Sequence, residues 1–338
     1  MSKRIIYCAD GTWDTVDNQT NVYKFYKALK TTAQQVPFYD DGVGADGNPF
    51  LKLVGGAFGT GLWTEVKEGY TAIAHVYEAG DEVFLFGFSR GAFTARSLGG
   101  MIAAAGLPTA NFDDTLVDLA FNAYRDKDDR AEILASLDQY QLFDAKIAMI
   151  GVWDTVGSLG IPALFGKVDP LLYGFLDTGL HPDVLNAYQA LAIDERRAEF
   201  PATLWTSAPV PGQTIEQVWF TGVHCDVGGS YPETGLADIT LSWMMGRGRA
   251  LGLEFDEAAW ARYASVDAKH ACDTLHESWN WRWLFPKHRS IDAGAALANS
   301  VNVRCRCDPG YRPSNLTLKG GVPSGYQSVE VVTEPVAT

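Results

Sequence analysis

The chain carries short apolar runs in which polar and apolar residues do not alternate, and this pattern most restricts its fold. The runs that show it are residues 5–9, 36–39, 83–86, 147–152 and 218–223. A strand without alternation is buried on both faces, which is typical of a parallel sheet covered by helices. Apolar residues between the runs recur at helical spacing, as Val22, Phe25 and Leu29 do. The sequence therefore predicts an α/β fold with a mostly parallel sheet and helices on both faces.

Composition and charge exclude several classes of protein. The chain has 338 residues, of which 47% are hydrophobic, and this fraction excludes a disordered chain. Its formal net charge is −14. An acidic protein lacks the basic stripe that nucleic-acid binding requires, so we expect no nucleic-acid partner. The same charge opposes resting adsorption to an anionic membrane but leaves transient membrane contact open.

The N-terminus and the cysteines indicate a protein made in the cytoplasm. The first apolar run is too short for the core of a signal peptide and ends at Asp10. No segment approaches the roughly 20 apolar residues that a membrane-spanning helix needs. Five scattered cysteines are too few for a disulfide framework, so we expect reduced thiols. The spacing of Cys305 and Cys307 does not match a zinc site.

Polar residues gather where four of the predicted strands end. Asp10-Gly11-Thr12 follows the first run, Ser89 the third, Asp154 the fourth and His224 the last. The carboxyl ends of parallel strands meet at one edge of the sheet, where α/β proteins bind their ligands. We therefore expect these side chains to lie close together and to form the site.

The segment Gly87-Phe88-Ser89-Arg90-Gly91 matches the pattern Gly-x-Ser-x-Gly between a buried strand and a helix of small residues. This is the context of a nucleophile elbow, a strained turn that presents a serine hydroxyl above the sheet. Glycines flank such a turn because side chains there would collide with the backbone. The simpler alternative is a glycine-lined turn in which Ser89 caps the helix. The strand before it and the helix after it favour the nucleophile.

A serine nucleophile needs a general base, and the base needs an orienting acid. Asp154 follows a buried strand and precedes the candidate histidines, so it is the preferred acid, with Asp226 as the alternative. His224, at a strand end that enters a glycine-rich turn, is the preferred base, and His276 is its rival.

The tetrahedral intermediate of acyl transfer needs two backbone N–H donors. We expect one from Arg90, the residue after the nucleophile, and the other from Gly11 or Thr12, after the first strand. This chemistry requires no metal and no organic cofactor.

Two other motifs compete with this interpretation. The segment Gly42-Val43-Gly44-Ala45-Asp46-Gly47 matches a dinucleotide-binding pattern, but Asn48-Pro49-Phe50 follows it in place of a helix. Several aspartates could together hold a divalent metal, but their spacing matches no known set of ligands. They are Asp10, Asp14, Asp41, Asp154 and Asp226.

Several segments together resemble one known family. They are Arg4-Ile5-Ile6 leading into Asp10-Gly11-Thr12-Trp13, Gly42-Val43-Gly44, Gly87-Phe88-Ser89-Arg90-Gly91-Ala92, Gly151-Val152-Trp153-Asp154-Thr155-Val156-Gly157, Ala192-Ile193-Asp194-Glu195-Arg196-Arg197 and Trp219-Phe220-Thr221-Gly222-Val223-His224-Cys225-Asp226-Val227-Gly228-Gly229. From Lys3 to about Met245 the chain is similar to the α/β-hydrolase family of type VI secretion phospholipase effector catalytic domains. The resemblance implies an α/β-hydrolase fold, a Ser-Asp-His triad and hydrolysis of glycerophospholipid acyl esters.

The resemblance carries over to single positions of this chain. It implies that Ser89, Asp154 and His224 form the triad. The family often has histidine where Gln189 stands here, and it commonly has serine where Cys225 stands and glycine where Ser230 stands. None of these departures removes a member of the implied triad.

We expect a single α/β-hydrolase domain over residues 1–338. Residues 158–182 follow the proposed acid and are apolar but broken by prolines and glycines, so they would form an insertion or a lid. Residues 270–338 would form a C-terminal appendage that packs on the core or binds a partner.

The predicted function is that of a serine esterase or lipase that cleaves acyl esters of lipids, with a phospholipase A as its specific form. One alternative is an esterase that acts on a soluble or polymeric ester. Another is a non-catalytic interaction module on a hydrolase scaffold. The expected partner is a lipid or other ester substrate. The resemblance also admits a secretion apparatus or an immunity protein as partner, and non-classical export of a protein made in the cytoplasm.

Overall fold

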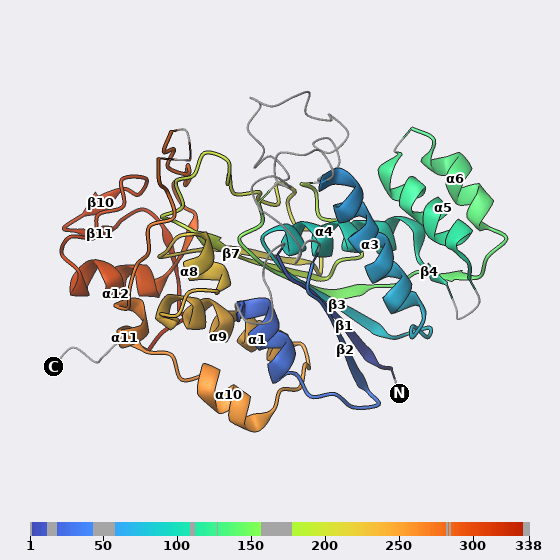
Figure 1. The fold of residues 1–338 in the computed structure, drawn as a ribbon, viewed down its shortest axis with the longest axis horizontal. Coiled ribbons are helices and arrows are strands. Elements are labelled where there is room, and N and C mark those ends of the chain that lie inside the picture. The colour runs from blue at the N-terminus through green and yellow to red at the C-terminus, as the bar shows by residue number, and fades with distance from the viewer. Residues whose placement is uncertain are drawn as a thin grey trace.

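A central sheet organises the structure, a computed structural model that describes residues 2–11, 19–42, 58–108, 112–126, 128–156, 178–281, 283 and 285–333. In these residues the sheet has eight strands in the order β12-β9-β8-β7-β6-β3-β1-β2, and every neighbouring pair is parallel (Figure 1). The strands are β1 (Arg4–Ala9), β2 (Gln35–Asp40), β3 (Glu82–Phe88), β6 (Ile147–Trp153), β7 (Asn186–Ala192), β8 (Thr214–Phe220), β9 (Ala296–Ala298) and β12 (Gln327–Val329). Two short ribbons lie outside it, β4 (Leu107–Pro108) with β5 (Leu142–Phe143) and β10 (Leu318–Lys319) with β11 (Val322–Pro323).

Helices cover both faces of this sheet (Figure 1). One face packs against α3 (Phe58–Ala74), α4 (Arg90–Ala105) and α5 (Asp114–Arg125), and the other against α1 (Asn21–Ala28), α9 (Gly235–Ala250) and α12 (Asn299–Cys307). The other helices in the described residues are α6 (Arg130–Leu137), α8 (His224–Gly228), α10 (Glu257–Tyr263) and α11 (Ala268–Ala271). Across the described residues, none of the helices combines the length and the apolar character that crossing a membrane demands.

The two layers of core explain why the strands show no alternation of polarity. In β1, Ile5 and Tyr7 belong to the core beneath α3 and α4, whereas Ile6 and Cys8 belong to the core beneath α1 and α9. All four side chains are at most 4% exposed. Because water reaches neither face, both sets of positions are apolar.

The α/β architecture predicted from the sequence is confirmed, with a parallel sheet and helices on both faces. The first four predicted strands are β1, β2, β3 and β6. The fifth prediction was partly wrong, because β8 begins at Thr214 and ends at Phe220. Residues 221–223 leave the sheet and lead into α8. Strands β7, β9 and β12 were not predicted from the sequence.

Two features of the sequence analysis fall largely outside the described residues. The glycine motif at 42–47 is described only at Gly42. Of the segment 158–182, expected to form an insertion or a lid, only residues 178–182 are described.

The C-terminal part of the chain contributes to the central sheet. β9 pairs with β8, and β12 pairs with β9. Leu297 of β9 and Val301 of α12 are buried in the core that also contains Val218 of β8. The described part of residues 270–338 therefore shares a core with the rest of the fold.

The expectation of reduced thiols was wrong for one pair of cysteines. Cys272, just after α11, and Cys307, at the end of α12, form a disulfide across 35 residues of chain. Packing of α11 against α12 brings the two together, and no spacing rule in the sequence indicates it. Cys8, Cys225 and Cys305 do not take part in a disulfide.

We predict that this disulfide stabilises the fold. Replacing both Cys272 and Cys307 by serine should lower the free energy of unfolding by about 4 kcal/mol, because a loop of that length gains freedom mainly in the unfolded chain. Urea unfolding of the variant and the parent protein measures the difference. Thiol titration in denaturant without reductant should find three thiols per chain. Five thiols before reduction would show that the bridge does not form.

Candidate active site

A tight turn between β3 and α4 carries Ser89. Its backbone has φ 58° and ψ −116°, a strained conformation for a residue with a side chain. A Cβ atom on Gly87 would lie 2.2 Å from the Gly91 carbonyl oxygen, and one on Gly91 would lie 2.1 Å from the Ala9 carbonyl oxygen. Only glycine fits at either position, and the turn has the geometry of a nucleophile elbow.

The Ser89 hydroxyl lies at the start of α4 but, among the described residues, makes no capping hydrogen bond to that helix. Its oxygen is instead 2.8 Å from Nε2 of His224. The N-terminus of α4 brings the positive end of a helix dipole to this oxygen. The simpler interpretation of Ser89 as a helix cap therefore does not describe this geometry.

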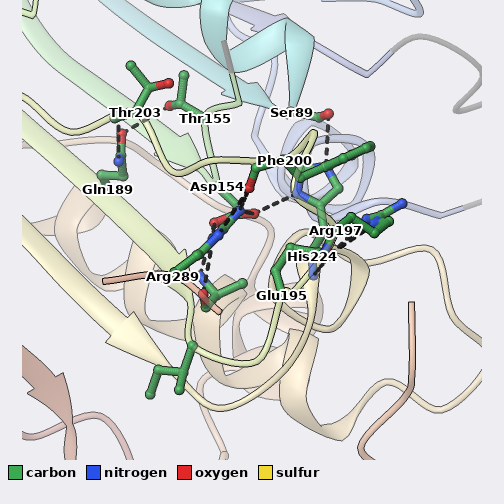
Figure 2. Close-up of polar contacts among 12 residues, drawn as sticks. Ser89, Asp154, Thr155, Gln189, Glu195, Arg197, Phe200, Thr203, His224 and Arg289 are labelled. Atoms are coloured by element: carbon green, nitrogen blue, oxygen red, sulfur yellow. Dashed lines mark hydrogen bonds and ion pairs between the residues drawn. The ribbon is translucent and has the colours of Figure 1, made fainter. Parts of the chain in front are cut away.

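Asp154 follows β6 and points toward His224. Its Oδ2 lies 2.6 Å from His224 Nδ1, so Ser89, His224 and Asp154 form one chain of hydrogen bonds (Figure 2). Asp154 is fully buried and His224 is 3% exposed. The Asp154 Oδ1 atom also accepts the backbone N–H of Ala192 at 2.9 Å.

His224 is the first residue of α8, which follows the end of β8. Its ring packs between Phe88, with centroids 4.6 Å apart, and Phe200, with centroids 5.2 Å apart. These two apolar rings help to shield the imidazole from water, and His224 is only 3% exposed. Both ring nitrogens lie within hydrogen-bond distance of their partners.

Burial and charge set the protonation states of this chain of hydrogen bonds. Although burial opposes ionisation of Asp154, the Arg289 guanidinium and His224 hold the pKa of that carboxyl well below its usual range. Burial lowers the pKa of His224 below its ordinary value, although Asp154 opposes the shift. His224 is therefore neutral at pH 7. Because the Asp154 carboxylate can only accept, Nδ1 carries the ring proton and Nε2 accepts from the Ser89 hydroxyl.

A second buried carboxylate, Glu195, holds the backbone of His224. Its Oε2 accepts the His224 N–H at 3.2 Å and pairs with the Arg197 guanidinium at 2.8 Å. Although burial opposes ionisation, Arg197 lowers the pKa of Glu195 to about 2. The same guanidinium lies over the Phe200 ring at 3.6 Å, so Glu195, Arg197 and Phe200 support His224 from one side (Figure 2).

The alternative acid and base, Asp226 and His276, pair with each other. His276 Nδ1 lies 2.6 Å from Asp226 Oδ1, and its Nε2 lies 3.2 Å from Glu233 Oε2. Asp226 also accepts the Val223 N–H at the start of α8. The pair thus fixes the start of the helix that carries His224. The histidine that is hydrogen-bonded to Ser89 is His224, not His276.

The loop after β1 is organised by Asp10. Its carboxylate accepts hydrogen bonds from Thr20 Oγ1 at 2.5 Å, the Tyr39 hydroxyl at 2.8 Å and the Gly11 N–H at 2.8 Å. Gly11 would have to exchange this bond before it could donate to an oxyanion. Thr12 lies outside the described residues, and Arg90 stands at the first position of α4, where the sequence analysis expects a donor.

The site contains two residues whose roles the sequence analysis did not predict. Glu195 lies in a quoted motif but was given no role, although its alternation with Arg197 could have indicated an ion pair. Arg289 lies 135 residues after Asp154 and donates to both of its oxygens. No motif or spacing in the sequence indicated that contact.

Two of the three residues that depart from the expected family pattern are Gln189 and Ser230. Gln189 is fully buried in β7, where it bonds to Thr155, Arg96 and the Thr203 carbonyl oxygen. Ser230 has φ 98°, a conformation that favours glycine, which is the residue that the resemblance leads us to expect at this position.

A metal site does not emerge from the described residues, in which no three His, Cys, Asp or Glu side chains gather in a way that could hold an ion. Asp154 and Asp226, two of the aspartates considered above, are engaged with Arg289 and His276. Asp14 lies outside the described residues.

Comparison with known proteins gives a family match. A family described as "T6SS, Phospholipase effector Tle1-like, catalytic domain" matches residues 3–247. An uncharacterized Saccharomyces cerevisiae protein, YEL023C, is 27% identical over 235 residues, which cover 61% of this chain and 33% of that protein.

Two solved structures are also similar. An uncharacterized protein from Pseudomonas aeruginosa has 15% identity and a TM-score of 0.44, with 77% of this chain and 47% of that chain covered. A Tle1 effector bound to the VgrG spike of the type 6 secretion system has 17% identity and a TM-score of 0.39, with 69% and 52% covered. The chain thus spans about a third of the curated relative and about half of each solved chain.

We predict that Gly91→Ala lowers the free energy of unfolding by about 3 kcal/mol, because the new methyl group would collide with the backbone at the end of β1. Gly246→Ala in α9 is a matched control, since a Cβ there meets nothing within 4 Å. It should stabilise the protein by about 0.5–1 kcal/mol. Thermal or urea unfolding compares the two variants. Equal effects would contradict the steric role of Gly91.

Proposed function

Because the chain belongs to the family of Tle1-like phospholipase effector catalytic domains of type VI secretion, we propose that it is a serine hydrolase that cleaves acyl esters of glycerophospholipids. The observation that carries the proposal is the chain of hydrogen bonds from Ser89 through His224 to Asp154. A strained serine, a neutral imidazole and a buried carboxylate are what nucleophilic acyl transfer requires.

The proposed reaction has two steps. His224 Nε2 takes the proton of the Ser89 hydroxyl as the oxygen attacks the ester carbonyl, and the protonated imidazole then gives it to the departing alcohol. In the second step His224 takes a proton from water as the water oxygen attacks the acyl-enzyme. The imidazolium then returns the proton to Ser89 Oγ as the ester bond to the serine breaks and the fatty acid is released. Asp154 holds the Nδ1–H tautomer and stabilises the imidazolium that forms. We propose that the Arg90 N–H donates to the oxyanion.

The family match also supports a proposal about the delivery of the protein. We propose export through a type VI secretion apparatus, with a phospholipid as the substrate met after delivery. An immunity protein is the second partner that an effector of this class would have.

We predict that purified protein reacts with an active-site fluorophosphonate probe at Ser89 and that Ser89→Ala abolishes labelling. Ester turnover should fall by roughly 10⁴-fold or more, because the nucleophile is lost. Labelling that persists in Ser89→Ala would exclude Ser89 as the nucleophile.

Release of fatty acid from phosphatidylcholine liposomes, compared with turnover of short nitrophenyl esters, tests the substrate class in the same preparations. Rapid cleavage of short esters without release from liposomes would contradict the phospholipase and favour a soluble-ester esterase. If neither ester is cleaved and no probe binds, the scaffold serves as an interaction module.

Substitutions of His224 and His276 provide a further prediction. His224→Ala should reduce kcat by roughly 10⁴-fold, because the serine loses its base. His276→Ala should keep kcat within about tenfold of the parent while lowering the melting temperature, since buried Asp226 loses its partner. Steady-state kinetics and thermal unfolding of both variants check this. A fully active His224→Ala would transfer the role of base to another residue.

A further inference from the structure

One segment beyond the family match contacts the proposed active site at three places. The match ends at residue 247. His276 bonds to Asp226 and Ser278 Oγ donates to Glu195 at 2.9 Å. Arg289 donates to Asp154. We call residues 276–289 the carboxylate-binding segment, because each of these three side chains holds a different carboxylate near His224.

The contact of Arg289 with Asp154 is the most specific of the three. Arg289 Nη1 lies 2.5 Å from Asp154 Oδ1, and Nη2 lies 2.9 Å from Oδ2, so the guanidinium and the carboxylate form a bidentate ion pair (Figure 2). Its remaining N–H groups donate to the carbonyl oxygens of Ala192, at 3.0 Å, and Phe200, at 2.8 and 3.2 Å. Arg289 is only 7% exposed. Such a planar fork fixes the orientation of a carboxylate as well as its charge.

The geometry links Arg289 to the imidazole through a shared atom. Asp154 Oδ2 accepts from both Arg289 Nη2 and His224 Nδ1. A carboxylate that rotated away from the guanidinium plane would therefore also move the oxygen that orients His224. A simple buried ion pair would neutralise the charge of Asp154 without this constraint on the imidazole.

We propose that Arg289 is a positioning residue for the hydrolysis proposed above, which holds the Asp154 carboxylate in the orientation that His224 requires. The carboxylate-binding segment then completes the active site from outside the matched region. The catalytic meaning of this inference rests on the proposed function, whereas the effect on His224 can be measured without substrate.

The charge of Arg289 should also act on the titration of His224. Among the described residues, the ionisable groups that act on that ring are Asp154, Glu195 and Arg197, with Arg289 beyond Asp154. Asp154 and Glu195 favour the imidazolium, whereas Arg197 disfavours it. Arg289 partly neutralises the charge of Asp154, and so it also disfavours the imidazolium form of His224. Loss of the Arg289 charge should therefore raise the pKa of His224.

The experiment compares Arg289→Gln, Arg289→Lys and Arg304→Gln with the parent protein. Arg304 is a matched control, since it is also 7% exposed and lies in the same C-terminal region. Its guanidinium bonds to Asp308 and to the carbonyl oxygens of Ala271 and Asp273. NMR titration of ¹⁵N-labelled histidine gives the pKa of His224, and steady-state kinetics give kcat and KM over the same pH range.

Three results are expected. Arg289→Gln raises the pKa of His224, and with it the acidic limb of kcat/KM, by about one pH unit, and lowers kcat about 100-fold at nearly constant KM. Arg289→Lys keeps the charge but loses the fork, so the pKa of His224 stays near the parent value while kcat falls about tenfold. Arg304→Gln lowers the melting temperature and changes neither the pKa of His224 nor kcat.

Several outcomes would overturn the proposal. A parental pKa and kcat in Arg289→Gln, with only a lower melting temperature, would assign Arg289 a structural role. If Arg289→Gln does not fold, Arg289→Lys decides, and a parental kcat in that variant rejects the positioning role. If Arg304→Gln changes the pKa of His224 and kcat as much as Arg289→Gln does, the effect would come from general destabilisation of the C-terminal region. Absence of probe labelling in the parent protein would instead reject the proposed function, while the NMR titration would still test the link between Arg289 and His224.

Discussion

A carboxylate buried away from water is the constraint on which the arrangement of the site depends. Asp154 is fully buried, and an isolated charge in such a place is strongly unfavourable. Its two oxygens accept from the Ala192 N–H, from His224 Nδ1 and from both terminal nitrogens of Arg289. Removal of one partner from a buried pair leaves an uncompensated charge, so these donors are required together. The position of the imidazole, and through it the environment of the Ser89 hydroxyl, follows from where they hold Asp154.

The topology of the sheet brings these groups together. β3 and β6 are neighbours, with Phe88 opposite Trp153, so Ser89 and Asp154 leave the sheet side by side. β7 lies next to β6 and supplies the Ala192 N–H, and β8 leads into α8 and His224. Parallel pairing places all these strand ends at one edge. Four adjacent strands therefore suffice to assemble a serine, an imidazole and a carboxylate from residues far apart in the sequence.

Much of this arrangement could be predicted from local sequence. Apolar runs such as residues 83–86 indicated strands buried on both faces. The glycines around Ser89 indicated a turn too tight for side chains. The structure confirms this, because a Cβ atom on Gly87 or Gly91 would collide with backbone atoms. Strand β7 was not predicted because the polar residue Gln189 interrupts its apolar pattern. Hydrogen bonds to Arg96 and Thr155, which are distant in sequence, allow this amide to be buried. The short strands β9 and β12 carry too few residues for a pattern.

Contacts between distant segments could not be predicted in the same way. Spacing in the sequence could not separate His224 from His276. Only their hydrogen bonds distinguish them, because His224 binds Asp154 and His276 binds Asp226. The disulfide between Cys272 and Cys307 depends on how α11 meets α12. Arg289 contacts Asp154 across 135 residues of sequence, and a single arginine forms no sequence motif from which such a contact could be predicted.

The dependence of Asp154 on Arg289 bears on how such a chain can change during evolution. The recognisable family region ends at residue 247, yet Arg289, the counterion of its buried carboxylate, lies 42 residues further on. Recombination at the apparent boundary would separate the acid from its counterion and leave both halves with an unmatched buried charge. The two regions should therefore be inherited together, and a fragment defined by sequence similarity alone is smaller than the unit on which selection acts.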